Sequence, residues 1–180
     1  MNEDIPIIES DNYRGGQIAT SRLIEKGARK IVHTTGPTEL ETPAHRRTQA
    51  YIETMKKSDL EPIIYHLDFN ISYEEKSKIF RRIFNEQPAL DGIFASNDVD
   101  AIMLMQIAQL LDKRIPEDIK IIGYDGTELI RNLYPNLTTI VQPITKITDK
   151  ALEVLNQRLK LQETNNEYVL DVSLWEGTSS

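Results

Sequence analysis

The 180-residue chain contains no cysteine, so disulfide bonds and thiolate chemistry are excluded. That absence is typical of a protein from a reducing compartment, and we expect a cytoplasmic location. Three histidines, His33, His45 and His66, are scattered along the chain without the spacing of metal ligands. The sequence therefore predicts neither a disulfide framework nor a metal site.

Basic residues are outnumbered, since 21 lysines and arginines face 28 aspartates and glutamates and leave a net charge of −7. Gripping nucleic acid requires a basic face, so we expect this chain not to bind DNA by itself. No apolar run approaches the length that spans a bilayer, about 18 residues or more. The first residues also lack the basic and apolar regions of a signal peptide. A hydrophobic content of 39% and a charged content of 27% fit a folded, soluble protein.

Catalytic signatures are missing as well. No serine lies in a nucleophile elbow, no glycine-rich phosphate loop follows a predicted strand, and no paired acids share a helix face. Gly15 and Gly16 fall at the start of a predicted helix and lack the spacing of a dinucleotide-binding loop. We therefore expect no enzyme activity and no cofactor.

The clearest pattern that is present begins at Leu90. The apolar run Leu90–Ala95 predicts a strand buried on both faces, and Ser96, Asn97 and Asp98 interrupt it with side chains typical of turns and helix caps. An almost entirely apolar helix follows from Val99. In open α/β sheets the loop after a strand is where ligands bind, so Asp98 becomes a candidate site residue.

The same strand–turn–helix unit recurs along the chain, which predicts an α/β fold with a mostly parallel sheet. The remaining strands are expected over Ile5–Glu9, Lys30–Thr35, Pro62–Leu67, Ile119–Gly123, Leu137–Val141 and Tyr168–Val172. The helices are expected over Tyr13–Lys26, Ala44–Lys57, from Ser72 onward with Glu75 completing a capping box, Thr127–Leu133 and Thr145–Leu161.

Two of these helices carry further expectations. The apolar stripe of the helix over Thr145–Leu161 predicts a buried face made of Ile147, Ala151, Leu152, Leu155 and Leu159. The segment Met103–Leu111 is more apolar than a helix covering one side of a sheet requires. Two interpretations remain open for it, an intramolecular core or a homodimer interface.

Several stretches in order resemble the effector-binding core of the lactose/galactose repressor (LacI/GalR) family. They are Asp11–Gly16 followed by Leu23–Gly27, Arg47–Tyr51 with Ala50 in place of the usual glycine, Asn97-Asp98 followed by Ala101, Ile115–Asp125, and Pro135–Ile140. The resemblance covers roughly Asp11 to Trp175. It implies a periplasmic-binding-protein-like (type I) fold with one complete lobe and part of a second.

This resemblance also implies a division of the chain. Residues 1–29 would be a remnant of the first lobe, 30–140 the second lobe, 141–172 return elements of the first lobe, and 173–180 a C-terminal tail packed on the second lobe. Family members carry an N-terminal helix-turn-helix headpiece, which is absent from this sequence.

The candidate ligand-binding residues are Arg47, Asp98, Phe69, Gln142 and Asp11. Arg47 matches the family's effector-contacting arginine, although spacing alone leaves a surface arginine open and Arg46 is the alternative if the register shifts by one. Asp98 would accept hydrogen bonds from sugar hydroxyls or cap the helix that follows it. Phe69 would stack on a sugar ring or staple the helix after Ser72.

Gln142 matches a crossover position near the ligand, and Asp11 lies at another strand exit. We interpret Asp125 as structural. The resemblance implies the sugar-binding and dimerisation part of a bacterial repressor, with a small-molecule sugar as effector and operator DNA bound through the missing headpiece. The loop from Gly36 to His45 loosely resembles sucrose-operon repressors. A sugar-binding protein of a transport system is the alternative, since it has the same fold.

Overall fold

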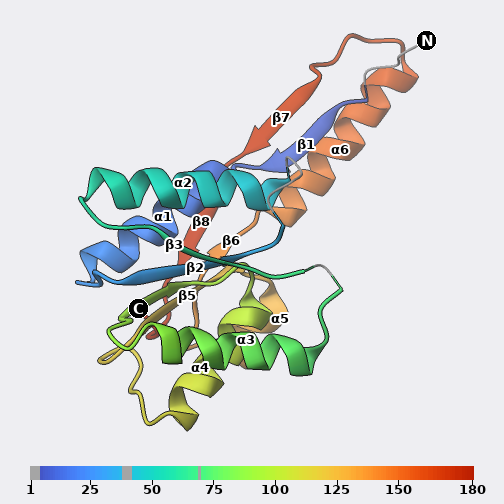
Figure 1. The fold of residues 1–180 in the computed structure, drawn as a ribbon. Helices are drawn as coiled ribbons and strands as arrows, with labels where there is room; N and C mark the ends of the chain where they lie inside the picture. The colour runs from blue at the N-terminus through green and yellow to red at the C-terminus, as the bar shows by residue number, and fades with distance from the viewer. Residues whose placement is uncertain (1–4, 38–41, 69) are drawn as a thin grey trace.

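The computed structural model describes residues 5–37, 42–68 and 70–180, which form a layered body with an arm projecting from one corner (Figure 1). A six-stranded sheet with the order β3-β2-β4-β5-β6-β8 makes the body, and a two-stranded sheet of β1 and β7 lies in the arm. All pairings are parallel except that of β6 with β8. The expected α/β architecture is confirmed.

Every helix, and every strand except β8, lies close to its predicted range. The strands are β1 (Ile7–Ser10), β2 (Ile31–Thr35), β3 (Ile63–His66), β4 (Gly92–Phe94), β5 (Lys120–Asp125), β6 (Thr138–Val141), β7 (Glu167–Leu170) and β8 (Ser173–Trp175). The helices are α1 (Asn12–Glu25), α2 (Pro43–Lys57), α3 (Tyr73–Glu86), α4 (Asp98–Leu110), α5 (Glu128–Leu133) and α6 (Ile144–Leu159). The capping box of Ser72 and Glu75 is present at the start of α3.

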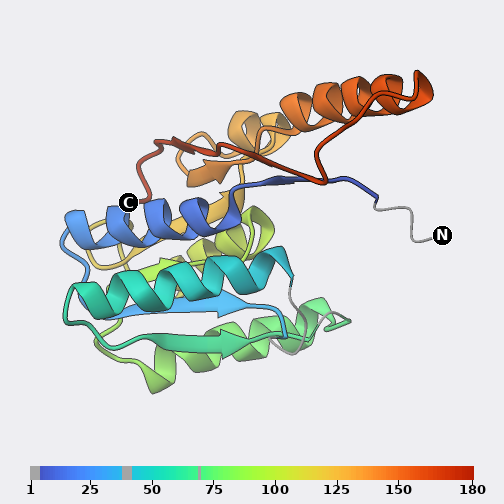
Figure 2. The same cartoon turned by 90° about the horizontal axis from the view of Figure 1, so that it is seen from above.

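The central strands are buried on both faces because helices cover both sides of the sheet, as Figure 2 shows. Alternate residues point to opposite cores. Ile93 and Ile121 join the core shared with α3 and α4, whereas Phe94 and Ile122 join the core shared with α1 and α2. A continuous apolar run is therefore what these strands require.

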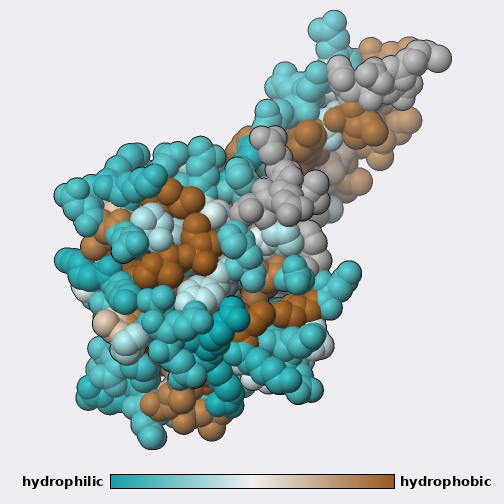
Figure 3. Space-filling model, viewed as in Figure 1, coloured by the Kyte–Doolittle hydropathy of each residue, from teal (hydrophilic) through white to brown (hydrophobic). Residues whose placement is uncertain are grey.

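The arm consists of β1, β7 and α6 and extends away from the body (Figure 1). The predicted buried face of α6 is wrong, since Leu152 and Leu155 are each 55% exposed and Leu159 is 73% exposed. Only Val154 of this helix is buried. The apolar stripe is real, but among the described residues nothing covers it, and Figure 3 shows hydrophobic surface along the arm.

The C-terminal segment returns to the body, where β8 pairs antiparallel with β6. The sequence did not predict β8, because three residues are too few to show an alternating pattern. Ser179, 1% exposed, then accepts a hydrogen bond from the Thr138 N–H at 2.9 Å and donates one to the Ile121 carbonyl at 2.6 Å. These bonds connect the N-terminal parts of β5 and β6, next to the first pair of residues at which the two strands are paired.

Across the described ranges, no helix has the length and apolar character needed to cross a lipid bilayer.

Candidate functional site

The carboxyl ends of β2, β4, β5 and β6 meet at one edge of the body sheet. The strand order reverses between β2 and β4, because the chain moves from β2 outward to β3 and then returns to the other side. A reversal of this kind opens a crevice at the strand ends, and this crevice is the usual ligand site of an open α/β sheet. The polar residues that surround it come from α1, α2, β1, β5 and the segment after β6.

Arg47 on α2 points toward this edge. Its Nη1 donates a hydrogen bond to Asn12 Oδ1 at 2.8 Å, and its guanidinium lies 4.3 Å from the centre of the Tyr124 ring. Burial lowers the pKa of Arg47 below its ordinary value. No described carboxylate forms a salt bridge with it, and its Nε is buried without a hydrogen-bond partner. A partly buried guanidinium therefore retains an unused donor.

Two adjacent glycines let α1 come close enough to hold this arginine. A Cβ on Gly16 would lie 2.5 Å from the Arg47 carbonyl oxygen, and one on Gly15 would lie 2.7 Å from the Tyr124 ring. Both distances are shorter than real Cβ contacts, so a larger residue at position 16 would push α1 away from α2, and one at position 15 would push it away from Tyr124 of β5. Gly15 and Gly16, which lack the spacing of a phosphate-binding loop, thus have a packing role beside the site.

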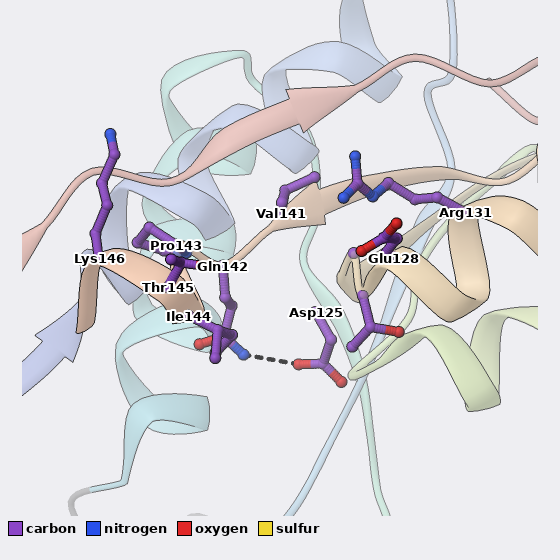
Figure 4. Close-up of a pocket in the computed structure, with 11 residues that line it drawn as sticks. Asp125, Glu128, Arg131, Val141, Gln142, Pro143, Ile144, Thr145 and Lys146 are labelled. Atoms are coloured by element: carbon purple, nitrogen blue, oxygen red, sulfur yellow. Dashed lines mark hydrogen bonds between the residues drawn. The ribbon is translucent and has the colours of Figure 1, made fainter. Parts of the chain in front are cut away.

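Asp125, Gln142 and Ser10 form a hydrogen-bonded chain from three separate elements. Gln142 Nε2 donates to Asp125 Oδ1 at 2.8 Å, and Ser10 Oγ donates to Gln142 Oε1 at 2.8 Å. Figure 4 shows Asp125 and Gln142 facing each other at the edge of a cavity of about 470 Å³. Burial raises the pKa of the Asp125 carboxyl, while the Gln142 bond and the charge of Arg47 oppose that rise.

Asp98 is placed differently from its prediction. It does not cap α4, because Asn97 is the N-cap and its Oδ1 accepts the Asp100 N–H at 2.8 Å. The Asp98 carboxylate is 2% exposed and turns beneath the crevice, where Oδ1 accepts the Thr139 hydroxyl at 2.5 Å and Oδ2 accepts the Gly126 N–H at 2.7 Å. Both oxygens are already bonded within the chain, so direct contact with a ligand has no support.

Asp11 caps α1, with its Oδ1 accepting the Arg14 N–H at 2.8 Å. It lies at the exit of β1, next to Ser10 and Asn12, as its sequence position predicts. The remaining candidate, Phe69, lies outside the described residues.

Sequence reasoning missed three members of this cluster, Asn12, Tyr124 and Asp125. The Asn12 amide oxygen accepts from both Arg47 and the Tyr124 hydroxyl, the latter at 3.1 Å. All three residues lie at or next to strand exits, a signal that was used for Asp98 and Asp11 but not for them. Asp125 was interpreted as structural, yet its carboxylate faces Gln142 at the crevice.

The chemistry of the cluster is that of reversible hydrogen bonding. It offers a guanidinium, a carboxylate and two amides at short range, and the described ranges contain no group of three acidic or histidine side chains that could hold a metal ion. Fixed donors and acceptors of both kinds suit a neutral, polyhydroxylated molecule.

Comparison with known families agrees with this architecture. The family model for the periplasmic binding protein-like domain matches residues 20–180. The chain belongs to this family. Its periplasmic-binding-protein-like fold and its resemblance to LacI-family regulators are thereby confirmed.

Individual relatives of this periplasmic binding protein-like chain are repressors. The ribose operon repressor of Halalkalibacterium halodurans is 40% identical over 160 residues, which cover 89% of this chain and 47% of that protein. The sucrose operon repressor of Streptococcus mutans is 37% identical over 177 residues, covering 98% of this chain and 53% of that one. The chain spans about half the length of the curated relatives it matches.

A solved structure is similar over nearly the whole periplasmic binding protein-like chain. The periplasmic binding protein/LacI transcriptional regulator of Alkaliphilus metalliredigens, crystallised with D-xylulofuranose, is 31% identical with a TM-score of 0.84. The match covers 98% of this chain and 66% of that chain.

Proposed function

We propose that this chain is the sugar-effector-binding and dimerisation part of a bacterial LacI-type transcriptional repressor. The observation that carries the proposal is Arg47, a partly buried guanidinium with an unpartnered Nε and no carboxylate partner among the described residues. A desolvated charge of this kind is costly unless a ligand completes its hydrogen bonds. Neighbouring sugar hydroxyls are suitable acceptors for its planar donors.

The groups around Arg47 extend the same proposal. Asp125 would accept hydrogen bonds from sugar hydroxyls, and the Gln142 amide would both donate and accept. Asp11, at the exit of β1, is a further candidate contact, and Asp98 supports the crevice from below. The names of the relatives support ribose or sucrose as the effector.

A sugar in this position would act on two bodies at once. Ser10, the last residue of β1 in the arm, bonds Gln142, which follows β6 of the body. Asn12 begins α1 directly after β1 and bonds Arg47 on α2 of the body. A ligand that replaces or strengthens them would favour one orientation of the arm over another. In the complete repressor this change would alter how the DNA-binding headpieces are presented to the operator.

A homodimer is the second part of the proposal. Val99 and Leu110 on α4 are 67% and 68% exposed, and Tyr73 on the neighbouring α3 is 73% exposed. Figure 3 shows hydrophobic surface over the end of α4. Exposed apolar side chains on adjacent helices are typical of an interface between subunits.

The experiment is isothermal titration of the full-length repressor with a panel that includes ribose and sucrose. One sugar should bind, and the substitution Arg47→Ala should weaken its binding by about 10- to 100-fold, because hydrogen bonds to a charged group contribute about 1.5–3 kcal/mol each. Arg46→Ala is the matched control, since the neighbouring arginine is half exposed and pairs with Glu9 of β1, whereas Arg47 bonds Asn12. Equal losses in the two variants would contradict the assignment of Arg47.

A transport protein remains the alternative interpretation of a sugar-binding fold. Sequencing the segment upstream of this chain distinguishes the two, because a helix-turn-helix indicates a repressor and a signal peptide indicates transport.

A further inference from the structure

Asp98 connects three elements that surround the crevice. It lies at the first position of α4, and its carboxylate accepts hydrogen bonds from Gly126, just after β5, and from Thr139 on β6. A Cβ on Gly123 would lie 2.3 Å from Asp98 Oδ1, so the carboxylate packs directly against the backbone of β5. A side chain at position 123 would occupy the place of the Asp98 carboxylate.

The turn held by this carboxylate has an uncommon backbone. Asp125 has a φ of 114° and Gly126 a φ of 58°. A positive φ is unfavourable for a residue with a side chain, and it persists only where the surroundings enforce it. The Gly126 N–H follows Asp125 directly and donates to Asp98 Oδ2 at 2.7 Å, while the Asp125 carbonyl accepts the Gln142 N–H at 3.1 Å on the other side of the turn.

The conformation of this turn determines where the Asp125 carboxylate points. Asp125 Oδ1 accepts the Gln142 amide at 2.8 Å, and a Cβ on Gly126 would lie 2.7 Å from the Val141 Cα. The turn is therefore packed against β6 while its side chain reaches the segment after that strand. A change in φ at Asp125 would move the carboxylate away from Gln142.

We propose that Asp98 is a positioning residue for the ligand site, holding the Asp125–Gly126 turn so that the Asp125 carboxylate faces the crevice. This inference rests on the proposed sugar-binding function. It assigns Asp98 a role through Asp125, with no contact of its own with the sugar.

The threonines of β6 provide a matched pair of test variants. Thr139 and Thr138 are adjacent and fully buried, but Thr139 donates to Asp98, whereas the Thr138 hydroxyl contacts Ser180 and Gly177 in the C-terminal segment. Thr139→Val and Thr138→Val remove the same atom from the same strand. Only the first removes a bond to Asp98.

A signal from Gly126 reports on the turn without any sugar. Labelling aspartate carbonyls with ¹³C and glycine amides with ¹⁵N selects Asp-Gly pairs, and this chain contains two, Asp91-Gly92 and Asp125-Gly126. Burial raises the pKa of Asp98 to about 6. The Gly126 amide shift should therefore follow a titration near that pH, and Gly92 serves as the internal reference.

Other charged groups near Asp98 must be separated from this signal. Asp125 on β5 also titrates and faces Asp98, Asp100 lies two residues further along α4, and Arg47 on α2 acts on Asp125. The variant Asp125→Asn removes the nearest of these. It is labelled on asparagine instead of aspartate carbonyls, which selects its one Asn-Gly pair, and it should retain the titration of the Gly126 amide. Asp98→Asn should abolish it.

The experiment combines this signal with sugar affinity, both measured on the full-length repressor. Asp98→Asn should weaken sugar binding about 10-fold or more, Thr139→Val should weaken it several-fold, and Thr138→Val should leave it within about two-fold of wild type. Thr139→Val also keeps the test valid if Asp98→Asn fails to fold. The Gly126 amide should shift in both Asp98→Asn and Thr139→Val but not in Thr138→Val.

Equal affinity changes in Thr139→Val and Thr138→Val, or an unchanged Gly126 amide in Asp98→Asn, would overturn the inference. Failure of the wild-type repressor to bind any sugar would instead overturn the proposed function. The Gly126 signal would then still decide whether Asp98 holds the turn.

Discussion

Arg47 and His33 are two basic side chains inside the body, and of the two only Arg47 carries a charge. Arg47 keeps a guanidinium beside the Tyr124 ring and an unpartnered Nε at the crevice. His33, 1% exposed, stacks on Phe94 and binds the Phe94 carbonyl and the Thr48 hydroxyl. Burial lowers the pKa of His33 to about 3, so it stays neutral where an exposed histidine would be charged. The unpaired charge belongs to the site, and the neutral ring belongs to the core.

His33 and Asp98 should affect acid stability in opposite directions. Unfolded histidine binds a proton near pH 6.5 and folded His33 only near pH 3, so acidification favours unfolding, by about 2 kcal/mol between pH 7 and 5. The pKa of Asp98 rises from 3.8 to about 6 on folding. Its protonation therefore favours the folded state, by about 1 kcal/mol over the same interval.

Urea unfolding at pH 7 and pH 5 separates the two contributions. Relative to wild type, Asp98→Asn should lose about 1 kcal/mol more stability on acidification, because the favourable protonation of Asp98 is gone while the unfavourable protonation of unfolded His33 remains. In His33→Asn, the change in the free energy of unfolding between pH 7 and pH 5 should be more favourable than in wild type by about 2 kcal/mol, because the unfavourable protonation of unfolded His33 is removed. Identical pH dependence in all three proteins would contradict the burial assigned to both groups.

The position of Asp98 also marks a limit of sequence reasoning at the scale of residues. Ser96, Asn97 and Asp98 all have side chains that cap helices, so propensity cannot decide which of them does so. The choice of Asn97 depends on Gly126 and Thr139, which are 28 and 41 residues beyond Asp98 and take up its carboxylate. No local pattern contains that information.

The helices show how much of each element a periodic pattern can predict. Their existence and approximate bounds followed from apolar spacing and capping residues, as with the Ser72 capping box of α3. The burial of α6 did not follow, because a stripe of leucines records which side is apolar and not whether another element covers it. The strand β8 was missed because its pairing with β6 is tertiary.

Of the two interpretations of α4, the intramolecular core is confirmed for one side of the helix, and the homodimer interface stays a prediction for the other. Met103, Leu104 and Ile107 are buried in the core shared with α3, whereas Val99 and Leu110 are exposed. The intramolecular core therefore accounts for one side. The other side is available for a partner subunit.

Charge substitutions on the two sides of α4 should have different consequences. Leu110→Glu should convert a dimer into a folded monomer in sedimentation equilibrium, because a charge on an exposed side chain disrupts association but not folding. Leu104→Glu should prevent folding, since Leu104 is 0% exposed. Lys57→Gln, at an exposed position of α2, is the control for charge, since it changes the net charge by the same single unit. A Leu110→Glu protein that remains dimeric would place the interface elsewhere.

At the scale of the whole molecule, the arm and the body differ in how completely they are packed. The body has two cores, one on each face of its sheet. The arm has one helix on a two-stranded sheet and leaves much of its apolar surface exposed. The hydrogen bond from Ser10 on β1 of the arm to Gln142, which follows β6 of the body, lies where the two parts join. The motion proposed for the repressor would occur at this junction.

The net charge of −7 leads to a prediction about DNA. This chain alone should not shift an operator fragment in a gel at physiological salt, because binding requires neutralisation of phosphates by basic groups. Full-length repressor is the positive control. A salt-sensitive shift with the chain alone would contradict the assignment of DNA recognition to a separate headpiece.

The central claim is that a sugar bound at Arg47 controls operator binding, and fluorescence anisotropy with labelled operator tests it most directly. Full-length wild type, Arg47→Ala and Arg46→Ala are titrated with the sugar identified by calorimetry. The account predicts equal operator affinity for all three without sugar, and a midpoint of the sugar response about 10- to 100-fold higher for Arg47→Ala alone. A wild-type response in Arg47→Ala would contradict it.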